Sequence, residues 1–318
     1  MVKLSILSLL DNTNFSGDIV ILTDANDSFE DLKIRTSRVT VIDIVTDNPV
    51  LSTKKLTRFN IFCLKSFVMD FVDLKKYKFC LYVDADVLFN LPNLDEALNY
   101  FTSIGKIQIS DNDGWTVAKR HHTTGVQVLT ESEIEDNKSF GVCAGIIGIP
   151  CNELGFSLLK DWKDMNLSGN LELDDQGNLT ALLLRKYKNS YSFMPFLNKN
   201  RWVLKDITHY CSGSSKPMFW HHGRSVLKKY RVDLPDLAGY FRMEKIGERL
   251  SNTWYIEDSI VYVDNPQITG FVQKTLFGYY IWWASNEGFE IISKDLQDCK
   301  SFRNGTFSIK PMKHSNDG

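Results

Sequence analysis

The stretch Lys78-Phe-Cys-Leu-Tyr-Val-Asp84-Ala-Asp86-Val-Leu-Phe-Asn-Leu-Pro92 decides the fold, because it ends an apolar, β-forming run with two carboxylates one residue apart. Side chains alternate between the faces of a strand, so Asp84 and Asp86 can point the same way just beyond its last hydrogen bond. Two nearby anions repel each other, and a divalent cation with oxygen ligands, Mg²⁺ or Mn²⁺, would relieve that repulsion. The sequence therefore predicts a metal site at the end of a buried strand. An Asp-rich turn that only closes the strand is the alternative.

Strand-like and helix-like segments alternate on both sides of this stretch. Strands are expected at residues 18–24, 40–45, 78–84 and 139–150, and helices at 4–10, 53–73, 152–164 and 174–187. Strands that alternate with helices indicate an α/β fold with a mainly parallel sheet, whose ligands gather outside the carboxyl ends of the strands. Asp84 and Asp86 lie at such an end.

The pattern of residues along the sequence changes near residue 250. Short alternating β-like runs rich in aromatic residues follow, separated by turn-forming Asn, Pro and Gly. We therefore expect a main domain over residues 1–245 and a small antiparallel, β-rich appendage over 250–318. Its aromatic residues would suit sugar stacking if they are exposed, and otherwise form a core.

Composition limits the class of protein. The 318 residues are 43% hydrophobic and 24% charged, as in ordinary globular proteins, and the formal net charge of -2 disfavours nucleic acid as a partner. No segment has the length of a membrane span. The six cysteines contain no C-x-x-C pair, which favours free thiols in a reducing compartment. We expect a cytoplasmic protein, either soluble or peripheral to the membrane, and leave a homo-oligomer open.

Three further segments contain residues that could bind a ligand or take part in catalysis. Ala144-Gly145 belongs to a glycine-punctuated strand, where tight packing and close ligand approach are equally good explanations. Asp175-Gln176 opens a helix, where an acid also suits the helix dipole. In the segment Met218–Lys229, histidines can bind a divalent metal and lysines can neutralise phosphates. A loop with a stacked imidazole would explain the histidines equally well.

The order of these motifs resembles the family 8 retaining glycosyltransferases, which include glycogenin and bacterial lipopolysaccharide galactosyltransferases. The matching segments are Leu56-Thr-Arg58, Asp84-Ala85-Asp86, Ala144-Gly145, Asp175-Gln176 and the His-x-Gly of His221-His222-Gly223. The resemblance covers roughly residues 1 to 230. It implies a Rossmann-like α/β/α sandwich of the GT-A type that moves a sugar from a UDP-sugar donor to a glycan, protein or lipid-linked acceptor. It also implies Mn²⁺, or Mg²⁺, as cofactor and retention at the anomeric carbon.

The resemblance also implies roles for individual residues. A metal would be held by Asp84, Asp86 and a histidine, for which His221 is slightly preferred over His222. Catalytic roles fall on Asp175, Gln176 and Arg58. Contacts to the donor fall on Asp84, Ala85, Asp86, Arg58, Ala144, Gly145, Gly223 and one of Lys228 and Lys229.

The sequence departs from the family pattern at four places. Cys143 stands where the family has Asn, and Thr180 replaces a second Asn. The lysines after His-His-Gly are displaced from their usual spacing. The family's first strand precedes the segment with which this sequence opens, so we expect it to be missing from the fold.

Three other classes of function are compatible with the motifs. A transferase-like protein that has lost donor turnover would still bind glycans through its aromatic tail. A nucleotidyltransferase also uses a metal and a nucleotide on this type of sheet, but the sequence has no glycine-rich, basic phosphate loop near its start. A D-x-D metal site of a hydrolase is compatible with the spacing as well.

Overall fold

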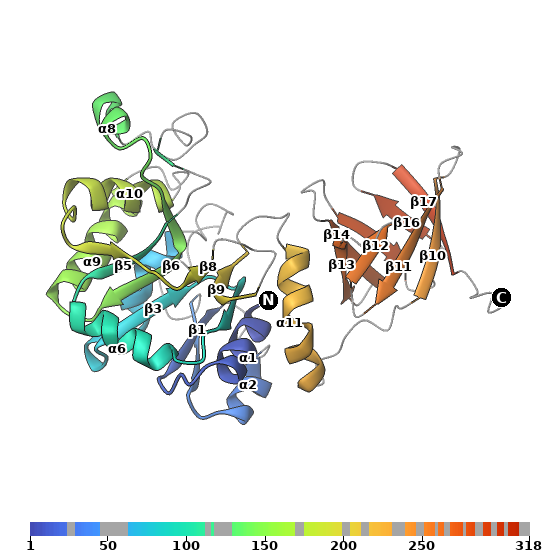
Figure 1. The fold of residues 1–318 in the computed structure, drawn as a ribbon, viewed down its shortest axis with the longest axis horizontal. Helices are drawn as coiled ribbons and strands as arrows, with labels where there is room; N and C mark the ends of the chain where they lie inside the picture. The colour runs from blue at the N-terminus through green and yellow to red at the C-terminus, as the bar shows by residue number, and fades with distance from the viewer. Residues whose placement is uncertain are drawn as a thin grey trace. The chain divides into compact units, whose positions relative to one another are not determined.

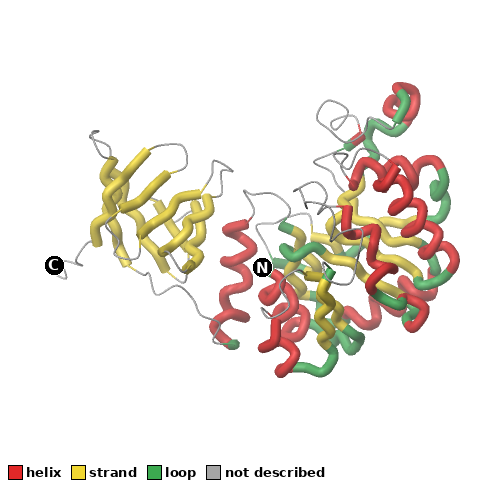
Figure 2. The backbone as a smooth tube through the Cα atoms, turned by 180° about the vertical axis from the view of Figure 1, so that it is seen from behind, coloured by secondary structure: helices red, strands yellow, loops and turns green. Residues whose placement is uncertain are grey.

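The computed structural model describes residues 1–23, 29–44, 63–111, 116–117, 129–168, 175–198, 204–210 and 216–230, together with eight strands between residues 239 and 311. Two compact units account for the chain. The first comprises Met1–Thr13, Ala85–Leu91 and Asn198–Gly318, and the second comprises Asn14–Asp84 and Pro92–Leu197. Figures 1 and 2 show their helices and strands from opposite sides.

The second unit is built on a four-stranded sheet. Its strands lie in the order β3 (Phe79–Val83), β6 (Val142–Pro150), β5 (Ile107–Asp111) and β7 (Tyr191–Phe193). β6 is antiparallel to both of its neighbours, whereas β5 and β7 are parallel, so β3, β5 and β7 all run the same way. The sheet is therefore mixed, and the prediction of a mainly parallel sheet is wrong. The reason is that β6 enters the sheet at the edge where β5 leaves it, with Val142 opposite Asp111.

A separate parallel pair of strands completes the sheet structure of this unit. β1 (Ile19–Thr23) pairs with β2 (Val39–Asp43), and the helix α2 (Glu30–Arg35) lies between them in the chain. This is the strand–helix–strand arrangement that the alternation of sequence patterns predicts.

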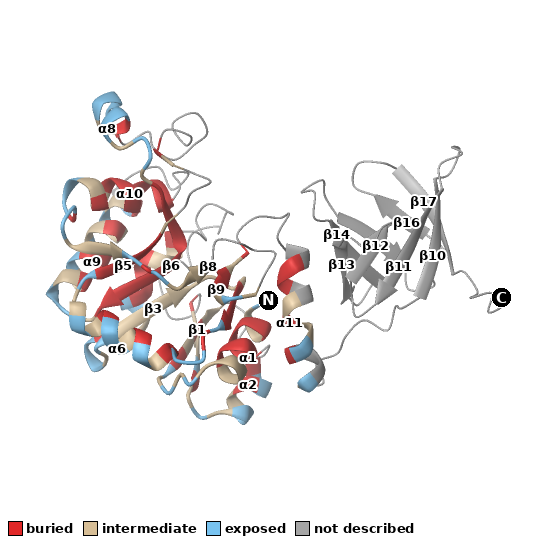
Figure 3. Cartoon of the chain, in the orientation of Figure 1, coloured by how far each residue is buried: buried red, intermediate tan, exposed pale blue. Residues whose placement is uncertain are grey.

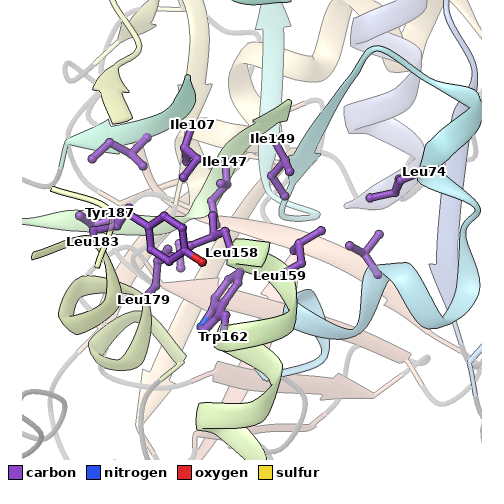
Figure 4. Close-up of a cluster of buried hydrophobic side chains, with 14 residues drawn as sticks. Leu74, Ile107, Ile147, Ile149, Leu158, Leu159, Trp162, Leu179, Leu183 and Tyr187 are labelled. Atoms are coloured by element: carbon purple, nitrogen blue, oxygen red, sulfur yellow. The ribbon is translucent and has the colours of Figure 1, made fainter. Parts of the chain in front are cut away.

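Helices cover both faces of the four-stranded sheet. On one face, α9 (Glu153–Ser168) and α10 (Asp175–Arg185) contribute to the main core cluster, in which Trp162 is almost fully buried (Figure 4). On the other face, α6 (Leu94–Ile104) packs through Phe101, whose ring centroid lies 6.0 Å from that of Phe79. Figure 3 shows this buried interior between exposed helix surfaces.

Tight packing explains one of the glycines of β6. A Cβ atom on Gly148 would lie 2.5 Å from the Phe79 ring and 2.8 Å from Cβ of Gln108. Since real Cβ contacts are almost never shorter than 3.0 Å, a larger residue would force these neighbours apart.

Short helices precede β3 and β6 in the chain. A 3₁₀ turn at Leu64–Phe67 continues into α5 (Val68–Phe71), and a second 3₁₀ turn covers Leu74–Lys76. The expected helix over 53–73 is described only from residue 63 onward, and it ends where Val72 becomes extended. Before β6, α8 (Glu131–Asp136) begins with a capping box between Thr130 and Glu133.

The first unit pairs helices with a three-stranded sheet. The sheet has the order β4 (Val87–Asn90), β9 (Asp206–His209) and β8 (Leu197–Asn198), with β4 antiparallel to β9. The helix expected at 4–10 is α1 (Val2–Asn12), and residues 216–229 form a helix, α11 (Lys216–Lys229), rather than a loop.

The C-terminal strands of the first unit form a closed antiparallel barrel. Its strands are β10 (Gly239–Lys245), β11 (Ser251–Glu257), β12 (Ile260–Val263), β13 (Ile268–Thr275), β14 (Gly278–Trp283), β15 (Phe289–Ser293), β16 (Asp298–Ser301) and β17 (Gly305–Pro311). Pairing of β17 with β10 closes the barrel. The antiparallel pattern expected from residue 250 is present, but its first strand already begins at Gly239, before the expected boundary.

Two further observations concern the helices and the cysteines. None of the helices among the described residues combines the length and apolar character needed to cross a membrane. The cysteines whose side chains are described, Cys63, Cys80, Cys143 and Cys151, are all free thiols. Burial raises the pKa of Cys80 to about 12 and that of Cys151 to about 11, which keeps both thiols protonated and unreactive.

Candidate functional site

The Asp84-Ala85-Asp86 turn is held at both ends by backbone hydrogen bonds. The chain leaves β3 at Asp84, whose N–H donates to the carbonyl of Gly145 at 2.8 Å. At the other end, the N–H of Tyr210 donates to the carbonyl of Asp86 at 3.0 Å. The two carboxylates therefore occupy a fixed turn between β3 and β4, at the carboxyl end of β3 as the sequence predicted.

A histidine completes a group that can hold a metal ion. One side-chain ligand atom from each of Asp84, Asp86 and His209 lies within 4.8 Å of the other two. Nε2 of His209 is 3.2 Å from Oδ1 of Asp86, and the two side chains are only 10% and 13% exposed. Two carboxylate oxygens and one imidazole nitrogen suit Mn²⁺ well, so this donor set fits the cofactor that the sequence motif implies.

His209 reaches the acids because β9 pairs with β4. His209 stands opposite Val87, the first residue after the D-x-D turn. Sequence analysis missed it, because a single histidine in Asp206-Ile-Thr-His209 carries no motif and only the pairing of two distant strands brings it to the site. His209 can be identified as a candidate ligand only once the pairing of β4 with β9 is known.

The two histidines predicted as metal ligands lie on α11. Nδ1 of His222 is 2.6 Å from the hydroxyl of Tyr210, so its ring makes a hydrogen bond to the residue that follows His209. The side chain of His221 lies outside the described part of the structure. The candidate metal group among the described residues thus contains His209 where the sequence suggested His221 or His222.

Lys65 joins two of the predicted motifs. Its ammonium nitrogen lies 3.4 Å from the Asp84 carboxylate and 3.2 Å from Oδ2 of Asp175. The side chains of Lys65 and Asp175 are only 9% and 5% exposed. Burial lowers the pKa of Lys65, but the carboxylates of Asp175 and Asp84 outweigh it, so the net pKa is raised and the ammonium stays charged.

Further contacts complete this buried cluster. The hydroxyl of Tyr82 donates to Oδ1 of Asp84 at 2.8 Å, and the Lys65 ammonium lies 5.8 Å from the centre of the Tyr82 ring. Oε1 of Gln176 accepts a hydrogen bond from the N–H of Ala144 at 3.3 Å. Asp84, Ala144-Gly145 and Asp175-Gln176, which are far apart in sequence, therefore meet at one edge of the sheet.

A second layer of buried polar contacts holds the start of α10. The indole N–H of Trp162 donates to the carbonyl of Asp175 at 2.9 Å. In addition, the side chains of Asn178, Asn166 and Ser66 form a chain of hydrogen bonds of 2.6 and 3.0 Å. Because Ser66 follows Lys65, this chain fixes the Lys65 turn relative to α10.

The remaining predicted donor residues have other surroundings. Gly223 lies against α1, where an added Cβ would clash with the side chain of Leu4. Nζ of Lys229 forms an ion pair with Asp11 at 2.6 Å. Arg58 and the side chain of Lys228 lie outside the described residues.

Comparisons with known proteins leave the functional case to the site itself. No protein-family model matches the chain, and no curated protein sequence matches it. Among solved structures, the chain is similar to the bifunctional glycosyltransferase WbbM in its apo form, with 13% identity and a TM-score of 0.46. The match covers 66% of this chain and 43% of WbbM, so the chain spans less than half of that protein. A likeness this distant carries no argument about activity, and the functional case rests on the site.

Proposed function

We propose that this protein is a metal-dependent glycosyltransferase, a hexosyltransferase that moves a sugar from a UDP-sugar to a carbohydrate-type acceptor with retention. The observation that supports this most is the meeting of Asp84, Ala144-Gly145 and Asp175-Gln176 around Lys65. These motifs are the ones on which the sequence resembles the family, and a purely structural Asp-rich turn would not require them to meet. The GT-A type of the fold is part of the same proposal.

In this proposal Asp84, Asp86 and His209 hold the divalent metal. When bound there, Mn²⁺ or Mg²⁺ supplies Lewis-acid stabilisation of the charge that develops on a departing diphosphate. The carboxylates are well suited to this task because each is already fixed through its own backbone. His221 and His222 remain the alternative third ligands that the family resemblance implies.

The protein's own residues would orient the donor and balance charge. Asp175 would stabilise the positive charge that develops at the anomeric carbon, and Gln176, which accepts a hydrogen bond from the N–H of Ala144, would lie beside it against the sugar. Lys65 would hold the carboxylates of Asp84 and Asp175 close together while the donor is absent. On the same proposal the acceptor's proton passes to the departing phosphate on one face of the sugar, which gives retention.

Donor contacts from the family resemblance complete the proposed site. Arg58 and one of Lys228 and Lys229 would bind the diphosphate by charge-assisted hydrogen bonds. The small residues Ala85, Ala144, Gly145 and Gly223 would allow the donor to approach the backbone closely.

The test is a UDP-release assay on the purified chain with a panel of UDP- and GDP-sugars, in Mn²⁺ and in EDTA. We expect metal-dependent release from one UDP-sugar, lost in Asp84→Ala and Asp86→Ala. The matched control is Asp73→Ala, an exposed acid beside a 3₁₀ turn. Silence across the panel, with no metal-linked binding of UDP in calorimetry, would exclude the transferase.

A glycan-binding protein without turnover is the second candidate. The observation in its favour is Cys143, which stands at the site next to Ala144 where the family has an amide side chain. Titration with UDP and Mn²⁺ separates the two, because a protein that only binds glycans would bind neither.

A further inference from the structure

Three aromatic side chains form a cluster at one end of the four-stranded sheet. The ring centroids of Phe140, Tyr191 and Phe193 lie 5.7, 6.2 and 6.0 Å from one another. Phe140 and Tyr191 pack against the main core, whereas Phe193 is 45% exposed. We call these three residues the aromatic cluster. A phenylalanine this exposed is unusual at the end of a core strand, where apolar residues are normally covered.

The strand directions place this cluster on the same edge as the D-x-D turn. Phe193 is the last residue of β7, and Asp84 directly follows β3, which runs in the same direction. Cross-strand pairing links Tyr82 to Ile147, Ile147 to Ile109 and Ile109 to Phe193. Directly paired residues share a face, so Phe193 lies on the face that carries Tyr82, three strand spacings away, or roughly 14 Å.

The geometry of the cluster leaves ring surface available. The Tyr191 and Phe193 rings meet edge to face, with an interplanar angle of 82°. In that arrangement the two rings do not stack on each other, and a flat apolar ligand surface can lie on the exposed side of Phe193.

We propose that the aromatic cluster binds a sugar ring of the acceptor, with Phe193 as the stacking residue. This proposal rests on the proposed transferase function and adds where the acceptor lies. A pyranose presents an apolar face of C–H groups to an aromatic ring and hydroxyls at its rim. The span of roughly 14 Å from β3 to β7 exceeds one sugar ring, so the acceptor would be an oligosaccharide rather than a monosaccharide.

An acid close to the aromatic cluster favours a sugar as its ligand. Asp111 ends β5 two residues beyond the partner of Phe193, whereas Asp84 and Asp175 are ion-paired with Lys65. A carboxylate next to an aromatic ring can accept hydrogen bonds from the hydroxyls at the rim of a sugar. One exposed aromatic ring is also too small a surface for a stable protein interface.

The experiment measures sugar binding and donor use separately. Saturation-transfer NMR of the intact chain reports sugar binding without any donor. The probes are methyl glycosides and β-linked and α-linked disaccharides of glucose, galactose and N-acetylglucosamine. Metal-dependent UDP release without acceptor reports the donor site. The variants are Phe193→Ala, the aromatic-conserving Phe193→Tyr, and Tyr100→Ala as a control at an aromatic residue that is 57% exposed on α6.

We expect Phe193→Ala to weaken saturation transfer to the best disaccharide at least about fivefold, whereas Phe193→Tyr and Tyr100→Ala leave it unchanged. UDP release without acceptor should stay the same in all variants, because β7, which carries Phe193, lies three strand spacings from β3 and the D-x-D turn. Thermal unfolding checks that each variant is folded.

Two outcomes would overturn the aromatic cluster as a sugar site. The first is that no probe binds, and the second is that a probe binds equally well to wild type and Phe193→Ala. If either occurs while UDP release remains metal-dependent, the transferase proposal survives. Binding that depends on Phe193, without any use of a donor, would support the sugar site and exclude the transferase.

Discussion

Lys65 is the residue on which the electrostatics of the candidate site depend. It lies between the carboxylates of Asp84 and Asp175, and both Lys65 and Asp175 are almost fully buried. A buried pair of this kind is costly to break from one side, because the remaining charge is left in a poorly solvated place.

We expect Lys65→Met to lower the free energy of unfolding by about 3 kcal/mol, because it leaves the Asp175 carboxylate without its cation. Urea denaturation measures the loss. Lys65→Met combined with Asp175→Asn should recover a large part of it.

The matched control for Lys65 is Lys160→Met, which removes an exposed ion pair with Asp164 of 2.6 Å. Solvent screens an exposed pair and side-chain entropy opposes it, so this variant should unfold almost like the wild type. Equal effects of Lys65→Met and Lys160→Met would contradict the role given to Lys65.

His209 is the residue whose variants test the metal site. We expect His209→Ala to weaken binding of Mn²⁺ in the presence of UDP by about 100-fold, because it removes one of three ligands. Titration of Mn²⁺ followed by electron paramagnetic resonance measures the affinity directly. His222→Gln should have a small effect, since that ring bonds to Tyr210.

The third variant of this set is His221→Ala, which tests the ligand preferred by the family resemblance. Loss of Mn²⁺ binding in His221→Ala, with binding intact in His209→Ala, would show that the sequence-based choice of histidine is the correct one.

At the scale of elements, the contact between α1 and α11 explains a glycine. Gly223 lies in the interior of α11, where glycine is normally unfavourable, and its missing side chain makes room for Leu4, which is 1% exposed. The close approach of the two helices gives this glycine a structural role besides the donor contact that the resemblance implies.

Gly223→Ala should therefore destabilise the protein, although alanine alone would stabilise a helix interior by about 1 kcal/mol. Overpacking against Leu4 should outweigh that gain and leave a net loss of about 1 kcal/mol in thermal unfolding. Ser225→Ala, at an exposed position of the same helix, is the control. A stable Gly223→Ala variant with impaired UDP binding would favour the donor contact instead.

Periodicity and motif order predicted the α/β class, most segment types and the Asp84-Ala85-Asp86 turn, because these depend on residues close in sequence. The direction of β6 and the positions of Lys65 and His209 could not be predicted in this way. Each depends on a pairing between distant segments, such as β4 with β9, that leaves no local pattern. The segment with Arg58 lies outside the described residues, so its prediction stays a prediction.

At the scale of the whole molecule, surface acids with lowered pKa values make stability depend on pH. A side-chain hydrogen bond from Arg185, with help from Thr130, lowers the pKa of Glu133 to about 2. Burial raises the pKa of Asp11 and of Asp161, but hydrogen bonds from a lysine and a tyrosine in each case leave the net pKa lowered. These acids therefore bind protons more weakly in the folded than in the unfolded protein.

It follows that their contribution to stability is present above the unfolded pKa of about 4 and is lost as the pH falls through the folded values. We expect the urea midpoint to fall between pH 5 and pH 2. Glu133→Gln should reduce this fall, whereas Glu131→Gln on the exposed side of the same helix serves as control. An identical pH profile for wild type and Glu133→Gln would show that the Glu133 pair is not formed in solution.

The pairing of β10 with β17 has a consequence for how the chain is made. On the ribosome the first barrel strand begins to emerge at Gly239, but its partner strand runs from Gly305 to Pro311. The barrel can therefore close only after β17 has been synthesised, and until then β10 lacks the strand that covers one of its edges. Nascent chains that stall between β10 and β17 would thus be the form of this protein most prone to aggregate or to need a chaperone.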